Sequence, residues 1–259
     1  MTPTRLPQKL RIIAALMIRE MITRYGRSWG GYVWAVLEPV ATIVALATVM
    51  SQFFQVPPIG SSFALFYASG FLPYALFNEV STQVGTAVHV NRTLMDIPGI
   101  TPIEAVLARM ILSVLTHAVV ALMILGGIAL IDPGMEVPYP EHLLTAMALA
   151  TLLGLAVGSL NVSLFAFMPT WRNVWPILKA PLFLISGILF LYAAMPSDIR
   201  SILWWNPLLH VVGESRQAFY STYDAGYVDF LWPLVIGTVG TIAGFGLMIL
   251  NRSAIVAAR

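Results

Sequence analysis

The sequence predicts an all-α integral membrane protein with a single transmembrane domain over residues 1–259. Hydrophobic residues make up 58% of the chain and charged residues only 10%, whereas about 25% of residues are charged in a typical soluble domain. The mean hydropathy is +0.82. Apolar windows of roughly 20 residues recur along the chain, and a helix of this length crosses a bilayer core of about 30 Å. The sequence lacks the alternating segments of about ten residues that are typical of a spanning β-barrel.

The N-terminal segment, residues 6–27, predicts an amphipathic helix that lies along the membrane surface. Four polar side chains fall within about 60° of one another at the helical period: Lys9, Glu20, Arg24 and Arg27. Apolar side chains gather on the opposite side: Leu10, Ala14, Met17, Ile18, Met21 and Tyr25. The alternative is an apolar, positively charged leader that only sets the topology. Because no small-residue cleavage site follows, we expect the segment to stay on the mature protein.

Six windows are long and apolar enough to span a membrane. They cover residues 32–54, 63–82, 107–131, 143–167, 174–194 and 230–250. Of the 14 Lys and Arg residues, all but Arg200 and Arg216 fall on the same side of these spans. Because Lys and Arg concentrate in cytoplasmic loops, both termini are expected in the cytoplasm.

The segment between the fifth and sixth spans predicts two short helices within residues 197–220. We expect Ser197 to be the N-cap of the first, and Asn206 and Pro207 to be the N-cap and first-turn proline of the second. Each helix is too short to span and too apolar for a solvated loop, which favours re-entrant or interfacial helices on the outer face. The alternative is an aromatic belt with a surface lid.

The chain offers little catalytic chemistry. It has no Cys, which excludes disulfides and thiol catalysis, and it contains neither a GxxxxGK[ST] nucleotide loop nor an HExxH zinc motif. The four histidines lack metal-ligand spacing, and Ser215 does not lie in a GxSxG elbow. His117 is best read as a residue that hydrogen-bonds between helices.

A pathway through the membrane is the better hypothesis. Ionisable side chains within spans face protein or water, and here they are Glu38, Glu79, Arg109 and Lys179. Glu38 and Lys179 are expected either to reach the interface or to form structural ion pairs. In the second span, Tyr67, Phe71 and Tyr74 share one face near Phe77. We expect these rings either to pack in the core, to face lipid or to line a channel. The Gly154/Gly158 and Gly240/Gly244 pairs permit close helix contacts.

Several motifs in order resemble those of one known family. They are RYGRS at residues 24–28, GYVWAVLEP at 31–39, NRTL at 91–94, TPIEAVLAR at 101–109 and NPLLHVVGESRQ at 206–217. Together they resemble the membrane subunit of ABC-2 type polysaccharide exporters, most of all the permease of group-2 capsular polysaccharide exporters of Gram-negative bacteria. The six spans, the surface helix and the re-entrant gate helices agree with the type V exporter architecture of that family.

The resemblance implies a homodimeric permease of the bacterial inner membrane with two copies of a separate cytoplasmic ABC ATPase. This chain would then need no cofactor, since ATP and Mg²⁺ would bind the ATPase. The family exports lipid-linked acidic polysaccharide, works with a periplasmic polysaccharide co-polymerase and an outer-membrane export protein, and binds no nucleic acid. The alternatives are an ABC-2 permease for O-antigen, teichoic acid or small hydrophobic compounds, and a stand-alone secondary transporter, which is expected to show more spans and discontinuous helices.

The resemblance also implies roles for individual residues. A coupling helix at 88–98 would contact the ATPase through Asn91, Arg92, Leu94, Asp96 and Pro98. The substrate would be loaded at Arg24, Arg27, Trp29, Tyr32, Trp34, Arg172, Trp175 and Lys179. Channel aromatics would be Tyr67, Phe71, Tyr74 and Phe77, in a channel lined by spans one, two and five of both protomers. A periplasmic gate would contain Trp204, Trp205, His210 and Arg216. Family members tend to carry a carboxylate where Gly213 stands, whereas here the carboxylate is Glu214.

Overall fold

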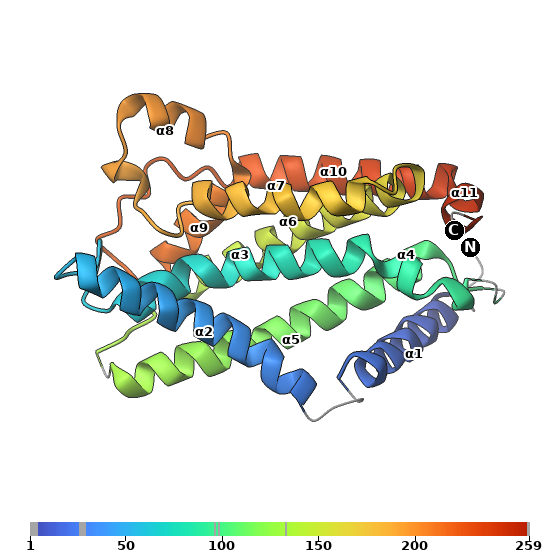
Figure 1. Cartoon of the computed structure of the whole chain (residues 1–259), viewed down its shortest axis with the longest axis horizontal. Coiled ribbons are helices and arrows are strands. Elements are labelled where there is room, and N and C mark those ends of the chain that lie inside the picture. Colours follow the sequence, from blue (N-terminus) through green and yellow to red (C-terminus); the bar gives the residue numbers. More distant parts are fainter. Residues whose placement is uncertain (1–4, 26–29, 96, 98, 133, 258–259) are drawn as a thin grey trace.

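The computed structural model describes residues 5–25, 30–95, 97, 99–132 and 134–257, and these residues form helices and loops with no strand. Six long helices run along the longest axis of the molecule (Figure 1). They are α2 (Gly30–Phe53), α3 (Phe63–Gly85), α5 (Pro102–Ile131), α6 (Pro140–Phe167), α7 (Trp171–Ile185) and α10 (Leu231–Leu250). Helix α11 (Arg252–Ala257) and the start of α1 (Arg5–Tyr25) lie at one end of the bundle, and α8 (Ser197–Leu203) lies at the other.

Four helices in the described part of the chain are long and apolar enough to cross a membrane: α2 from Val33 onward, α5, α6 and α10. Helix α3 falls outside this set, although its 23 residues are long enough, and most of its side chains are buried in the bundle. Helix α7 has 15 residues, which span about 22 Å and therefore less than the hydrocarbon core.

The prediction that residues 174–194 form one continuous spanning helix was wrong. Helix α7 ends at Ile185, and Gly187 then takes a left-handed backbone conformation with a φ of 78°. The guanidinium of Arg216 donates hydrogen bonds to the carbonyls of Ile188 and Phe190, both at 3.0 Å. A distant buried arginine therefore satisfies backbone groups that a helix would have paired internally.

Helix α6 packs against α3 on one side and α10 on the other, and glycines make both contacts close. A Cβ atom on Gly158 would lie 2.6 Å from the Cβ of Val84, and one on Gly240 would lie 2.9 Å from the Cβ of Ala156. The predicted small-residue contacts are thus confirmed between helices of this chain.

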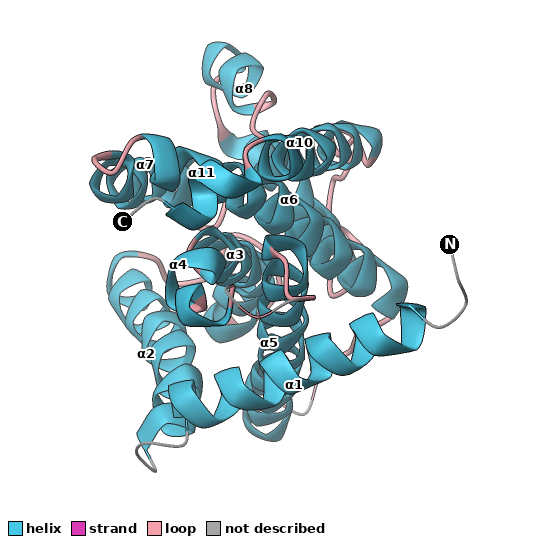
Figure 2. Cartoon of the chain, turned by 90° about the vertical axis from the view of Figure 1, so that its right-hand side faces the viewer, coloured by secondary structure: helices cyan, strands magenta, loops and turns pink. Residues whose placement is uncertain are grey.

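Helix α1 crosses the end of the bundle (Figure 2). Its apolar side is exposed, with Leu10, Ile18 and Ile22 all at least 60% exposed. Its polar side faces the protein, because Glu20 accepts a 2.5 Å hydrogen bond from Arg109 of α5. Of the expected polar side, Glu20 and Lys9 contact the protein, while the side chains of Arg24 and Arg27 lie outside the described residues. The apolar side expected at Leu10 and Ile18 points away from the protein.

The short helices follow the sequence expectations only in part. The segment between α3 and α5, expected as a coupling helix over 88–98, instead forms α4 (Ala87–Val90) and a 3-10 turn, η1 (Arg92–Leu94). Asn206 caps α9 (Pro207–Gln217) by accepting a hydrogen bond from the Leu208 N–H at 3.0 Å. Ser197 was the wrong N-cap for α8, because Pro196 occupies that position and Ser197 is already helical.

Candidate functional site

A polar cavity of about 120 Å³ lies between α2, α3 and α5. Its lining residues are Ala35, Glu38, Pro39, Phe71, Tyr74, Ala75, Asn78, Glu79, Thr116 and His117. Two carboxyl groups, an amide and an imidazole thus face the same space within the bundle. Ionisable groups within helix bundles of membrane proteins face protein or a water-filled cavity, and this volume is large enough for several water molecules. We call this space the polar cavity.

An apolar groove of about 710 Å³ adjoins the polar cavity between α2 and α5. It extends from Met21 in the last turns of α1 to Met123, and Thr116 is the only polar side chain among the described residues of its lining. Ala35 and Thr116 line both the groove and the polar cavity. The two spaces together offer neighbouring polar and apolar surfaces, which is what an amphipathic molecule requires.

Lys179 joins α7 to α3 beside the polar cavity. Its amine donates a hydrogen bond to the Thr82 hydroxyl at 3.0 Å, and its backbone carbonyl accepts one from the Tyr74 hydroxyl at 3.1 Å. Lys179 therefore contacts α3 through a hydroxyl partner, and the structural ion pair expected as one alternative stays a prediction. Glu38 instead is exposed and lines the polar cavity.

The other residues expected to meet substrate are only partly described. Trp34 is 64% exposed on α2, and Trp175 is half-buried on α7. Arg27 and Trp29, and the side chains of Arg24 and Tyr32, lie outside the described part of the chain.

The aromatic side chains of α3 pack mainly in the core. Tyr67, Tyr74 and Phe77 are each at most 7% exposed. Tyr74 meets Phe183 of α7 edge to face at 5.3 Å between ring centroids, and Phe71 meets the same ring at 6.4 Å. Only Phe71 and Tyr74 of the four also reach the polar cavity.

The expected gate residues lie at the α8 end of the bundle, where aromatic rings join α8, α9 and α10. Trp204 stacks on Trp232 at 5.9 Å and meets Trp205 at 5.6 Å. His210 is buried beneath them, hydrogen-bonded to the Trp204 carbonyl at 2.7 Å and accepting the Asp229 N–H at 3.0 Å. Burial lowers the pKa of His210, which favours the neutral ring that these two partners require.

Arg216 is also part of this end, but it is 1% exposed and its charge lies 4.3 Å above the ring of Phe66. Its contacts hold the backbone after α7. The neighbouring carboxylate Glu214 bonds to His142 of α6 at 2.8 Å and accepts from Gln217 at 3.0 Å. Gly213 leaves no room for a side chain, because a Cβ there would lie 2.6 Å from the Tyr227 hydroxyl.

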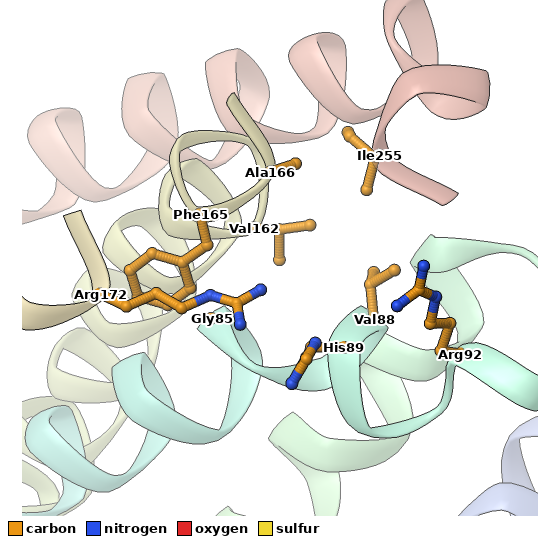
Figure 3. Close-up of a pocket in the computed structure, with 9 residues that line it drawn as sticks. All are labelled: Gly85, Val88, His89, Arg92, Val162, Phe165, Ala166, Arg172 and Ile255. Carbon is orange, nitrogen blue, oxygen red and sulfur yellow. The ribbon is translucent and has the colours of Figure 1, made fainter. Parts of the chain in front are cut away.

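The expected coupling residues lie at the opposite end. Asn91 is buried and accepts a 2.7 Å hydrogen bond from Arg19 of α1, while Arg92 and Leu94 are half-buried. Asp96 and Pro98 lie outside the described residues. Arg92 shares a pocket with Arg172, which the sequence assigned to a different role, and with His89 (Figure 3).

Sequence reasoning missed several of these contacts. The cluster of His89, Arg92 and Arg172 brings together residues far apart in the chain, and the Glu20–Arg109 and Lys9–Glu104 pairs do the same. The presence of Arg109 and Glu104 at the start of a span was the available signal, since charges there require partners.

Comparison with known proteins supports one family for the whole chain. The profile of the ABC-2 type transporter family matches residues 11–220. Polysialic acid transport protein KpsM of Escherichia coli is 29% identical over 91% of each chain. The capsule polysaccharide export inner-membrane protein BexB of Haemophilus influenzae is 24% identical over 88% of this chain and 89% of its own. CtrC of Neisseria meningitidis, with the same descriptive name, is 22% identical over 89% of this chain and 88% of its own.

Proposed function

Because the chain belongs to the ABC-2 type transporter family, we propose that it is the channel-forming permease subunit of an ATP-driven exporter of capsular polysaccharide. Its cargo is lipid-linked acidic polysaccharide, carried from the cytoplasm across the inner membrane. The observation that carries this proposal is the likeness over about nine tenths of the chain to proteins named for polysialic acid transport and capsule polysaccharide export.

The proposed topology has six membrane crossings with both termini in the cytoplasm. Helices α2, α3, α5, α6, α7 and α10 make the crossings, and the segment after Ile185 completes the fifth. Two features support this arrangement: α1 and α11 lie at the end opposite α8, and nearly all Lys and Arg residues fall on the α1 side of the spans. The apolar side of α1 then contacts lipid at the cytoplasmic surface.

Energy enters through partner chains in this proposal. Two permease copies bind two ABC ATPase subunits, which hold ATP and Mg²⁺, and the α4–η1 segment is the contact to each ATPase. A periplasmic co-polymerase and an outer-membrane export protein continue the path. The hydrogen bond from Arg19 of α1 to Asn91 supports coupling, because it ties this segment to the surface helix.

The polar cavity and the apolar groove are the proposed loading site. A lipid-linked glycan has an apolar tail that fits the groove and a polar head that fits the cavity, and the two spaces share Ala35 and Thr116. The carboxylates and Asn78 accept or donate hydrogen bonds to sugar hydroxyls, and Tyr74 and Phe71 offer ring faces beside them.

Filling the groove tests the loading site. We expect Leu115→Trp to abolish surface capsule, because Leu115 lines the groove and is 54% exposed. The matched control is Leu122→Trp, since Leu122 is on the same helix and 72% exposed but does not line the groove. Capsule at the cell surface is measured with an anti-capsule antibody at equal protein levels. Normal capsule with Leu115→Trp would remove the groove from the path.

The cargo is tested with the purified complex. Lipid-linked capsular glycan is expected to stimulate ATP hydrolysis by the permease–ATPase complex, whereas lipid-linked O-antigen glycan is not. Stimulation by O-antigen glycan alone would assign the chain to a different exporter of the same family.

A further inference from the structure

Three basic side chains meet in a pocket at the α1–α11 end of the bundle. Its lining residues are Gly85, Val88, His89, Arg92, Val162, Phe165, Ala166, Arg172 and Ile255. They come from the end of α3, the α4–η1 segment, the end of α6, the start of α7 and α11 (Figure 3). In the part of the chain that the structure describes, this lining contains no acidic side chain. We call this space the basic pocket.

The three basic side chains all line this pocket. In Figure 3 the Arg172 guanidinium extends toward the side of the pocket where His89 lies, and Arg92 lies on the other side of Val88. The Arg172 guanidinium lies 5.8 Å from the centroid of the Phe165 ring, which supports its position. Among the described residues, no carboxylate lies within ion-pair distance of either arginine.

The electrostatic environment of His89 agrees with a concentrated positive charge. Burial, followed by the charges of Arg172 and Arg92, lowers the pKa of His89. Among the described side chains, helices α6 and α11 contribute only apolar groups to the pocket, so the described charged groups facing His89 are these two arginines. An anion in the pocket would offset this repulsion.

The size of the basic pocket restricts its ligand. The space is about 20 Å³, which is close to that needed for a single water molecule, and it opens to the surface where His89 and Arg172 are exposed. It therefore suits a small ionic group with the rest of the ligand outside, rather than a sugar ring. The pocket lies where α3 and α6 end and α7 begins, which is headgroup depth if these helices cross the bilayer.

We propose that the basic pocket binds a phosphate ester anion. Arginine guanidinium groups bind phosphate oxygens through paired, charge-assisted hydrogen bonds, and the His89 ring adds a third donor. The phosphate comes from the headgroup of an anionic phospholipid or from a soluble phosphate compound. The position of the pocket at the ends of α3 and α6 and the start of α7, at headgroup depth in the proposed topology, favours the lipid source. Binding needs neither ATP nor the exported glycan, so it stands apart from the proposed transport.

Occupation of the pocket has two consequences. The bound phosphate bridges the α4–η1 segment to α7, which in the proposed exporter links the ATPase contact to a channel helix. Its affinity increases as the pH falls through the pKa of His89, because the protonated ring attracts the anion and the anion in turn raises that pKa.

Native mass spectrometry of the purified permease tests the lipid source. The protein is extracted from nanodiscs of phosphatidylcholine mixed with phosphatidylglycerol, and retained lipids are counted per protomer. We expect selective retention of phosphatidylglycerol, and the Arg92→Gln/Arg172→Gln variant to bind it about tenfold more weakly or worse. The matched control is Arg11→Gln/Arg252→Gln, which removes the same charge at the same end, where both residues are exposed, and should retain the lipid.

A second arm tests the soluble source. Inorganic phosphate and glycerol phosphate are titrated against the detergent-solubilised protein. Binding of either compound, without selective retention of phosphatidylglycerol in the first arm, assigns the pocket to soluble phosphate. Equal loss of lipid in both double variants, or no phosphate binding in either arm, would overturn the proposal. If the double variant does not fold, as judged by its unfolding temperature, Arg172→Gln alone is compared with Arg252→Gln by the same criteria.

Discussion

At the scale of single residues, every charged side chain that the described structure buries meets a partner from a distant part of the chain. The five are Glu20, Glu104, Arg109, Glu214 and Arg216. Glu20 pairs with Arg109, Glu104 with Lys9 and Glu214 with His142, while Arg216 donates to two backbone carbonyls. A buried charge without such a partner is strongly destabilising, so these contacts fix how α1, α5, α6 and α9 fit together.

The two ion pairs of α1 predict different effects on stability. Glu20→Ala removes the carboxylate that pairs with the buried Arg109 and is expected to cost about 3 kcal/mol. Lys9→Ala is the matched control on the same helix. Its buried partner Glu104 keeps the hydrogen bonds from the backbone N–H and the hydroxyl of Thr101, and the Lys9 side chain is 59% exposed, so its loss should cost at most about 1 kcal/mol. Denaturant unfolding in detergent measures both. Equal costs would mean that the Glu20–Arg109 pair does not anchor α1.

His210 predicts a pH dependence of stability. Burial lowers its pKa in the folded protein, whereas the unfolded side chain titrates near 6.5. Above that pH the His210 ring is neutral in both the folded and the unfolded protein. As the pH falls below about 6.5 and through the lowered pKa, the unfolded protein takes up the proton first, so the free energy of unfolding decreases. Unfolding midpoints at pH 7 and pH 5 should therefore differ more for the wild type than for His210→Asn. An equal difference would contradict a buried neutral ring.

At the scale of elements, α6 is the helix around which the bundle is packed. It contacts α3, α9 and α10, and its glycines allow the backbones of its neighbours to approach. Gly154 faces Val80 and Gly158 faces Val84 on α3, while Ala156 and Ser159 meet glycines of α10. In a membrane, such close packing replaces the hydrophobic driving force that holds soluble bundles together.

The packing of α6 predicts opposite outcomes for two glycine substitutions. Gly158→Ala would place a Cβ atom 2.6 Å from Val84 and 3.1 Å from the Ser81 carbonyl, and overpacking of this kind costs about 1–3 kcal/mol. Gly246→Ala on α10 is the control, because nothing lies within 4 Å of its Cβ position, and alanine there favours the helix. Thermal unfolding in detergent should show a lower midpoint for the first and an unchanged or higher midpoint for the second.

The sequence could predict most elements because their signals are local. Apolar length identified α2, α5, α6 and α10, and Asn206 with Pro207 identified the start of α9. The end of α7 could not be predicted in this way. Its apolar pattern continues past Ile185, and the backbone leaves the helix where Arg216, 28 residues away from Ile188, supplies the hydrogen bonds.

At the scale of the whole molecule, composition was enough to predict a membrane protein, whereas the separate ATPase that supplies its energy was implied only by the family resemblance. The candidate site was less accessible to sequence reasoning. Glu38, Glu79 and His117 were recognised individually, but only the packing of three helices brings them around one cavity beside an apolar groove. The basic pocket likewise depends on how the α4–η1 segment folds against the start of α7.

The proposed export itself is tested most directly in sealed proteoliposomes that contain the permease and its ATPase, with the ATPase facing outward. Lipid-linked capsular glycan is added outside, and its protection from an external glycosidase is measured over time. The account predicts that protected glycan accumulates only with ATP and Mg²⁺ and not with a hydrolysis-deficient ATPase. Protected glycan that accumulates without ATP, or none at all from a complex that hydrolyses ATP, would contradict it.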